Sequence, residues 1–150
     1  MCSWCWGFRE ARDEVFKAIG EEVRIEFVMG GLAKDSDEPM PEETKSYIKE
    51  AWRQVNARTG AEFNGDFWEN CQPRRSTYPS CRAVIAAAGK GAEMFDRIQQ
   101  AYYLEARNPS DVEVLCSLAA ELGLDEEEFH AKLISAEVEA ELQAGFNTRR

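Results

Sequence analysis

The residues with the clearest chemistry are two cysteines, Cys2 and Cys5, separated by Ser3 and Trp4. Residues three positions apart lie about one turn apart on a helix, so these thiols can meet and can form or break a disulfide with little backbone movement. A helix N-terminus stabilises a thiolate and can lower a cysteine pKa from ~8.5 to about 3.5–7.5. We therefore predict Cys2 as the exposed nucleophile and Cys5 as the buried resolving cysteine of a disulfide-exchange centre, with Trp4 and Trp6 as apolar cover.

Zinc binding is the main alternative for a cysteine pair. A structural zinc site normally takes four ligands, often from two close pairs. The remaining cysteines are scattered at Cys71, Cys81 and Cys116, and His130 is the only histidine. We interpret these three cysteines as small buried hydrophobic residues. The sequence therefore predicts no metal site and no bound cofactor, with the redox-active dithiol itself carrying the reaction.

Composition narrows the class of protein. The chain has 150 residues, of which 44% are hydrophobic and 31% charged, as in an ordinary globular domain. Its formal net charge of -10 disfavours nucleic acid and anionic membranes as partners. No apolar run is long enough to span a bilayer, no signal-peptide pattern is present, and the odd count of 5 cysteines argues against a disulfide framework. We expect a cytoplasmic protein.

The elements that must position the pair are a helix and a strand. Apolar residues at helical spacing predict a helix from Cys5 to about Gly20. Residues 23–29 alternate between apolar and charged and are rich in β-branched and aromatic types, which predicts the one strand of the chain. Because a lone strand leaves its backbone groups unpaired, we expect dimerisation through residues 23–29.

The rest of the chain is predicted to be mostly helical. A long amphipathic helix is expected from Pro41 to Arg58, residues 60–78 are expected to be irregular, and helices follow from Pro79 onward. Three helix starts carry capping signals: a capping box at 110–113, an acidic first turn opened by Asp125, and a serine cap at Ser135.

Four segments together resemble one known family. They are residues 1–8 (MCSWCWGF), 28–32 (VMGGL), 75–83 (RSTYPSCRA) and 99–103 (QQAYY). In this combination the chain resembles the DsbA-type thioredoxin-like thiol–disulfide oxidoreductases, in particular their cytoplasmic branch with a Cys-Ser-Trp-Cys centre. The resemblance covers nearly the whole chain and is far more specific than a lone Cys-x-x-Cys.

The resemblance implies a fold and its divisions. We expect an α-rich α/β protein: a partial thioredoxin-like fold, holding the first active-site helix and one strand, with a large helical insertion domain. Residues 1–40 would begin the thioredoxin-like domain, residues 41–136 would form the insertion, and residues 137–150 would start the return. The family has a strand before its first cysteine and a cis-proline loop after the insertion, so we expect this chain to be truncated at both ends.

The resemblance also implies exchange of disulfides with protein or peptide thiols, through Cys2 as nucleophile and Cys5 as resolving cysteine, with glutathione as a candidate reductant. Two alternatives stay open. One is a relative of the kappa-type glutathione transferases and isomerases, which also carry a helical insertion but commonly have serine at the nucleophile position. The other is a non-catalytic helical fragment whose cysteines are idle.

Overall fold

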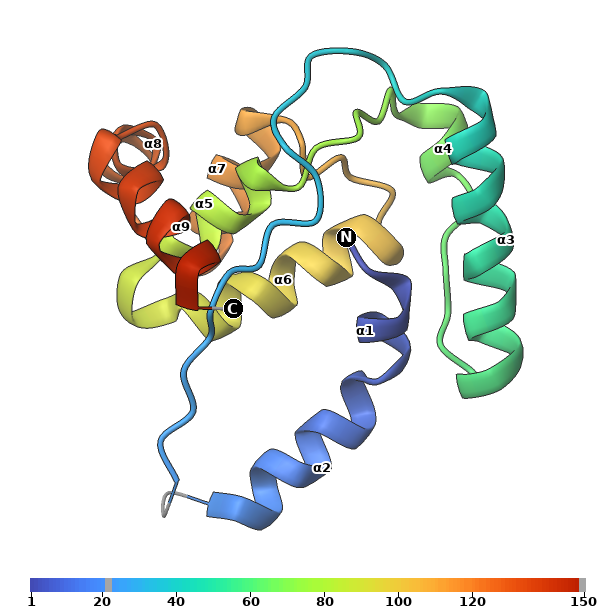
Figure 1. The fold of residues 1–150 in the computed structure, drawn as a ribbon, viewed down its shortest axis with the longest axis horizontal. Coiled ribbons are helices and arrows are strands. Elements are labelled where there is room, and N and C mark those ends of the chain that lie inside the picture. Colours follow the sequence, from blue (N-terminus) through green and yellow to red (C-terminus); the bar gives the residue numbers. More distant parts are fainter. Residues whose placement is uncertain (21–22, 149–150) are drawn as a thin grey trace. The chain divides into compact units, whose positions relative to one another are not determined.

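The computed structural model describes residues 1–20 and 23–148 (Figure 1). The chain divides into two compact units. Unit 1 comprises Met1–Glu26 and Pro41–Phe63, and unit 2 comprises Phe27–Met40 and Asn64–Arg150. Among the helices of the described residues, none is long and apolar enough to cross a membrane. The predicted boundaries of a helical insertion at residues 41 and 136 stay a prediction.

In its described residues, unit 1 has three helices: α1 (Ser3–Gly7), α2 (Arg9–Ile19) and α3 (Glu42–Thr59). The predicted first helix is confirmed in outline, but it begins at Ser3 rather than Cys5 and is divided at Phe8. Phe8 lies between α1 and α2, with φ of -85° and ψ of -6°. Gly20 ends α2 as predicted, with its N–H donating to the Phe16 carbonyl. The helix predicted from Pro41 to Arg58 is α3, for which Pro41 is the N-cap.

The apolar residues of α2 do not form a core in this unit. None of the residues in α2 is buried, and Phe8 and Val15 are exposed. In α3, by contrast, Trp52 and Val55 are buried, and the Trp52 ring stacks on Phe63 with a centroid distance of 5.0 Å. The core of unit 1 therefore lies on the α3 side and includes Trp6 of α1.

The strand predicted over residues 23–29 is wrong. These residues are neither helical nor paired as a strand, and the one β-pairing recorded within the described residues is an isolated bridge between Pro39 and Arg74. The alternating pattern was compatible with an extended backbone, but a strand also needs a neighbour to receive its hydrogen bonds. The described chain offers residues 23–29 no such neighbour, so this segment is a non-helical connection.

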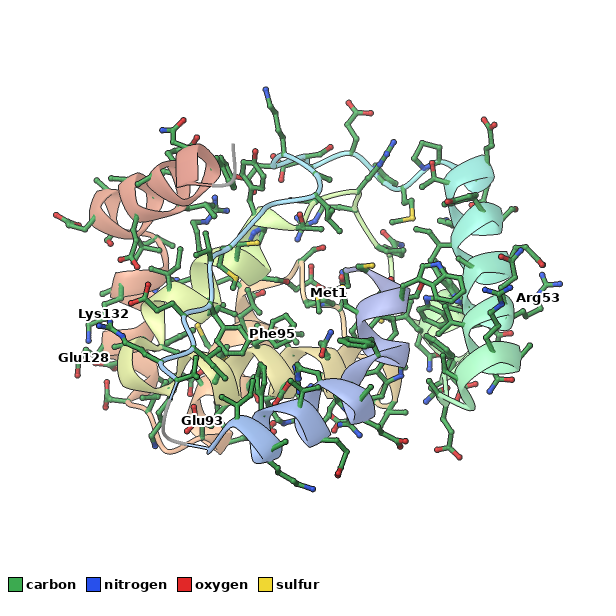
Figure 2. The ribbon with its side chains drawn as sticks, turned by 60° about the horizontal axis from the view of Figure 1, so that its bottom comes forward. Met1, Arg53, Glu93, Phe95, Glu128 and Lys132 are labelled. Carbon is green, nitrogen blue, oxygen red and sulfur yellow. The ribbon has the colours of Figure 1, made fainter. Side chains whose placement is uncertain are left out.

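Unit 2 contains α4 (Phe67–Asn70), α5 (Tyr78–Ala86), α6 (Gly91–Tyr103), α7 (Val112–Glu121), α8 (Glu126–Leu133) and α9 (Ala136–Thr148). Helix α5 contacts α6, α7, α8 and α9, so it is the central element of this unit. The largest fully buried apolar side chains of the unit come from these helices and include Phe67, Met94, Ile98, Tyr103, Leu115, Leu118 and Leu142. Figure 2 shows the side chains, among them Glu128 and Lys132 of α8, whose charged groups are 2.7 Å apart.

Two of the three predicted helix caps are confirmed. The Asp125 carboxylate accepts the Glu128 N–H at 2.8 Å, and the Ser135 hydroxyl accepts the Val138 N–H at 3.2 Å. The capping box at 110–113 is wrong. Asp111 is the N-cap of α7 without a side-chain cap, and its carboxylate receives the Arg74 guanidinium at 2.9 Å. A long-range ion pair has taken the place of the local hydrogen bond.

The segment 27–40 is fixed within unit 2 by specific contacts. The Leu32 and Ala33 N–H groups both donate to the Thr77 hydroxyl at 2.9 Å. Gly31 has a φ of +55°, and a Cβ built there would lie 2.7 Å from ring carbons of both Tyr78 and Phe146. This close approach of backbone to two aromatic rings requires glycine.

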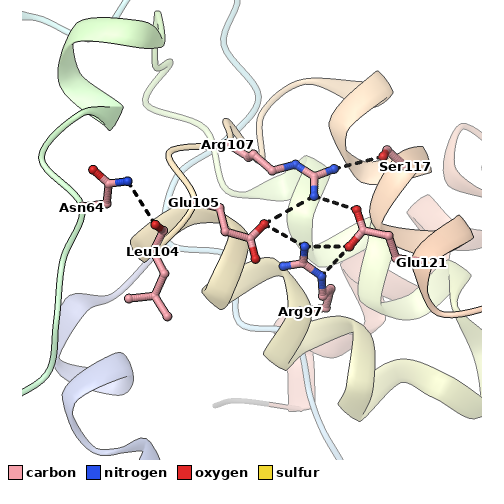
Figure 3. Close-up of polar contacts among 7 residues, drawn as sticks. All are labelled: Asn64, Arg97, Leu104, Glu105, Arg107, Ser117 and Glu121. Atoms are coloured by element: carbon pink, nitrogen blue, oxygen red, sulfur yellow. Dashed lines mark hydrogen bonds and ion pairs between the residues drawn. The ribbon is translucent and has the colours of Figure 1, made fainter.

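Four charged side chains form a closed network on unit 2 (Figure 3). Arg97 contacts Glu105 and Glu121, both at 2.7 Å. Arg107 contacts Glu121 at 2.7 Å, Glu105 at 3.4 Å and the Ser117 hydroxyl at 3.0 Å. The network joins α6, α7 and the residues that follow α6, and every charge in it has two partners of opposite sign.

Candidate active site

Cys2 lies at the N-cap of α1. Its backbone is extended, with φ of -98° and ψ of 115°, and its carbonyl accepts the Cys5 N–H at 3.1 Å and the Trp6 N–H at 3.4 Å. The placement at a helix start follows the sequence prediction. The hydrogen bond from Cys5 closes the turn, so the two cysteines are held one turn apart.

Both cysteines of the pair are free thiols, and their side chains are hydrogen-bonded to each other. The predicted order of exposure is wrong: Cys2 is half-buried and Cys5 is exposed. The pKa of Cys5 is nevertheless raised to about 11, first by burial, then by the hydrogen bond and the negative charge of Cys2. These findings are compatible because exposure averages over the whole residue, whereas the pKa responds to the atoms that surround the sulfur.

Trp6 joins α1 to the turn that follows α3. Its ring is buried, with 5% of the residue exposed, and its indole N–H donates to the Glu62 carbonyl at 2.9 Å. The Arg9 guanidinium lies 4.5 Å from the Trp6 ring centroid. Trp4 was also predicted to cover the sulfurs, but it is exposed. Of the two tryptophans, only Trp6 is buried as an apolar cover would be.

Gly7 brings α1 close to α3. A Cβ built on Gly7 would lie 2.6 Å from Val55 Cγ1 and 2.9 Å from Thr59 Oγ1, closer than real Cβ contacts. Only a glycine allows the helix backbones to approach to this distance without displacing Val55, which is fully buried. The α3 helix therefore sets the position of the short helix that carries the cysteines.

The remaining candidate residues lie outside this arrangement. Cys71, Cys81 and Cys116 are all in unit 2, where Cys116 is buried and the Cys71 thiol donates to the Ala106 carbonyl at 3.0 Å. Cys71 and Cys81 are half-buried rather than buried as predicted. His130 is exposed on α8. Among the described residues, no group of three or more histidine, cysteine or acidic side chains could hold a metal ion.

Sequence reasoning missed the Trp6–Glu62 contact and the role of Gly7. Both depend on residues more than forty positions away along the chain, for which local spacing carries no information. The available signal was the pair Trp6-Gly7 directly after Cys5. A buried tryptophan usually finds an acceptor for its indole N–H, and a glycine allows close approach of the backbone, so the pair indicates a packing contact.

Comparison with known proteins assigns the chain to a family. The family model described as thioredoxin matches residues 1–149. The chain is 27% identical over 149 residues to the ClpXP adapter protein SpxH of Bacillus subtilis, an alignment that covers 95% of this chain and 48% of SpxH. The chain thus spans about half the length of the SpxH proteins that it matches.

Solved structures show the same relationship. A candidate protein disulfide isomerase from Nitrosomonas europaea superposes with a TM-score of 0.85 at 28% identity, covering 99% of this chain and 72% of that protein. The cytosolic disulfide reductase DsbM from Pseudomonas aeruginosa superposes with a TM-score of 0.80 at 26% identity, covering 99% and 73%. DsbM has also been solved with glutathione. The chain belongs to the thioredoxin family, with disulfide oxidoreductases of the DsbA type among its structural neighbours.

Proposed function

We propose that this chain exchanges disulfides with protein or peptide thiols through Cys2 and Cys5. The observation that carries the proposal is the pair itself: Cys2 at the N-cap of α1, with its thiol hydrogen-bonded to that of Cys5 one turn later. Similarity to a disulfide reductase and to a candidate disulfide isomerase supports the same chemistry.

In the reducing direction, the Cys2 thiolate attacks one sulfur of a substrate disulfide, whose S–S bond breaks and whose other sulfur leaves as a thiolate. A mixed disulfide then joins Cys2 to the substrate. Cys5 loses its proton and attacks the Cys2 sulfur, releasing the second substrate thiolate and leaving a Cys2–Cys5 disulfide. The substrate gains two electrons, and the departing thiolates take up the two protons that the cysteines lose.

Cys2 is the better attacker because Cys5 has its pKa raised to about 11 and stays protonated near neutral pH. In the mixed disulfide Cys2 no longer carries a negative charge or a free thiol. Two of the causes that raise the pKa of Cys5 are then gone, so the intermediate itself favours the deprotonation of Cys5 that the second step needs.

The reductant that regenerates the dithiol is proposed to be glutathione, as the glutathione-bound structure of DsbM suggests. The description of DsbM as a cytosolic disulfide reductase supports a cytoplasmic location for this chain as well. Dimerisation through residues 23–29 stays a prediction, now without the strand on which it was based.

The test is the reduction of a model protein disulfide by the pre-reduced chain, followed by the appearance of substrate thiols. Cys2→Ser is expected to abolish turnover, and Cys5→Ser to leave a trapped mixed disulfide on Cys2. Cys71→Ser is the matched control, because a serine hydroxyl can still donate to the Ala106 carbonyl. Equal rates for the wild type and Cys2→Ser would refute the proposal, and glutathione binding without redox turnover would favour the glutathione-transferase alternative.

A second candidate is a role as an adapter for the ClpXP protease, favoured by the similarity to SpxH. Adapter binding needs no thiol chemistry. Binding of ClpX by the wild type and by Cys2→Ser with equal affinity, together with no disulfide turnover by either, would support this candidate over disulfide exchange.

A further inference from the structure

We propose that Trp6 is a positioning residue for the dithiol. The ordered turn after α3 holds the Trp6 indole, and Trp6 in turn fixes the two cysteines. This proposal rests on the proposed disulfide exchange and adds to it the residues that fix the geometry of the pair. Trp6 directly follows Cys5, and its backbone N–H donates to the Cys2 carbonyl at 3.4 Å, so the Trp6 backbone belongs to the same helical turn as both cysteines.

The helix that carries the pair cannot hold its own shape. It spans Ser3–Gly7 only, without a side-chain cap at its start and with no acidic residue in its first turn. Isolated helices of one or two turns are not stable in water, so tertiary contacts must fix α1. Two contacts bind α1 here: the Trp6 indole donates to Glu62 in the turn that follows α3, and Gly7, which lacks a Cβ, lets α1 approach α3 closely.

The acceptor of the Trp6 indole is part of an ordered turn. Gly60 ends α3 with a φ of 74°, and its N–H donates to the Asn56 carbonyl at 2.8 Å. The Asn56 side chain donates to the Ala61 carbonyl at 3.0 Å, and the Thr59 hydroxyl accepts the Ala61 N–H at 3.2 Å. These bonds fix the peptide units directly before Glu62, so its carbonyl is aimed at Trp6 by residues of α3.

The contact has the properties of a positioning device. The Trp6 ring is buried and also lies under the Arg9 guanidinium, so the ring is fixed on more than one side. A hydrogen bond from a buried indole to a backbone carbonyl is directional, and breaking it leaves a buried donor without its acceptor. Without it α1 is free to fray from its first turn, and the Cys2–Cys5 spacing and the helix amides near Cys2 are no longer held in place.

Loss of the Trp6 hydrogen bond is expected to shift the redox equilibrium of the Cys2–Cys5 pair. Glutathione disulfide oxidises the dithiol to the Cys2–Cys5 disulfide and is itself reduced to two glutathione molecules, with two electrons and two protons transferred. An ordered helix start stabilises the reduced dithiol, so loosening it shifts this equilibrium toward the protein disulfide. For Trp6→Phe, which keeps an aromatic ring and removes the N–H, we expect a shift of roughly three- to tenfold, or about 15–30 mV for this two-electron couple.

The experiment equilibrates the full chain in glutathione buffers of graded composition and quenches it by alkylation. The reduced and oxidised forms of the tryptic peptide 1–9, whose only cysteines are Cys2 and Cys5, are then quantified. Asn56→Ala is the second variant: Asn56 is exposed, so its loss should leave the fold intact while loosening the turn before Glu62. Trp68→Phe, the same change in unit 2, is the matched control and should leave the equilibrium unchanged.

A shift toward the disulfide in both Trp6→Phe and Asn56→Ala, absent from Trp68→Phe, supports the proposal. Equilibrium constants equal to that of the wild type in both variants, or equal shifts in all three, overturn it. The readout needs no substrate turnover. A wild type that equilibrates with glutathione but reduces no protein disulfide would therefore refute the proposed function, while the equilibrium constants of the variants would still decide the role of Trp6.

Discussion

At the scale of single residues, the two cysteines of the pair have different surroundings although they lie one turn apart. Cys2 lies before the helix and Cys5 within it, where burial and the neighbouring Cys2 raise its pKa to about 11. A raised cysteine pKa keeps the proton on the sulfur in the folded state. Between the ordinary cysteine pKa of 9.0 and the raised pKa of about 11, the folded chain retains a proton that the unfolded chain releases, so Cys5 makes stability fall as pH rises through that window.

This asymmetry predicts the effect of removing Cys2. In Cys2→Ala the hydrogen bond and the negative charge are lost, and the pKa of Cys5 falls toward its ordinary value, with burial still raising it. We expect Cys5 to be alkylated faster at pH 9.5 in Cys2→Ala than in the wild type, measured by peptide mapping after iodoacetamide treatment. Cys71 is an internal control, because its raised pKa comes from burial and from Asp111. Equal rates at Cys5 would contradict the coupling of the two thiols.

The sequence was sufficient to predict which residues form the pair and that Cys2 lies at a helix start, since both follow from local spacing. It was insufficient to predict their exposure. Cys5 was expected to be buried because it lies inside the helix, but α1 presents its buried face through Ser3 and Trp6 instead. Burial depends on the neighbours of a helix, here α3, and these are distant in sequence.

At the scale of elements, the close approach of α1 to α3 predicts the cost of a single methyl group. Gly7→Ala places a Cβ 2.6 Å from Val55 Cγ1. Overpacking a well-packed contact destabilises by about 1–3 kcal/mol, so we expect a lower free energy of unfolding in urea by that amount.

A double-mutant cycle supplies the control. Val55→Ala removes the methyl group that Gly7→Ala would meet, at its own cost for the cavity it leaves. Combined, the two substitutions should destabilise less than the sum of the single changes, by about 1 kcal/mol or more. Strict additivity would show that the two positions are not in contact.

The helices were predictable where a periodic apolar face and an end signal agree. Helix α3 begins within one residue of Pro41 and ends at Thr59, next to Gly60, and α8 begins after Asp125 as its acidic start indicated. Prediction failed where tertiary contacts decide. Residues 23–29 alternate like a strand but have no neighbouring strand, and Asp111 binds Arg74 instead of serving a local capping box.

At the scale of the whole molecule, the chain first passes from one unit to the other at Glu26–Phe27, through residues that form neither helix nor strand. The Arg24 side chain there is 87% exposed, whereas the ion-paired Arg82 and Arg97 are only 17% and 16% exposed. We expect limiting trypsin to cut first after Arg24, as measured by mass spectrometry of early digests. Arg24→Gln should delay the first cut, and an initial cut inside α5 or α6 would contradict the expectation.

The family was predictable from four short segments, because the combination of a Cys-Ser-Trp-Cys start with the later motifs is specific. The division into units was not derivable in the same way. Unit 1 joins residues 1–26 to residues 41–63, and unit 2 takes up the segment between them. Such an exchange of segments depends on contacts like Gly31 against Tyr78 and Phe146, which no local pattern encodes.

The closed network of Arg97, Glu105, Arg107 and Glu121 has a consequence for how the sequence can drift over generations. Because every charge there has two partners, neutralising any one of them leaves each neighbour with one opposite charge rather than none. A first substitution at this place is therefore tolerated, and it removes the tolerance for a second loss of the same sign. Descendants of this protein should lose such charges in compensating pairs, one arginine together with one glutamate.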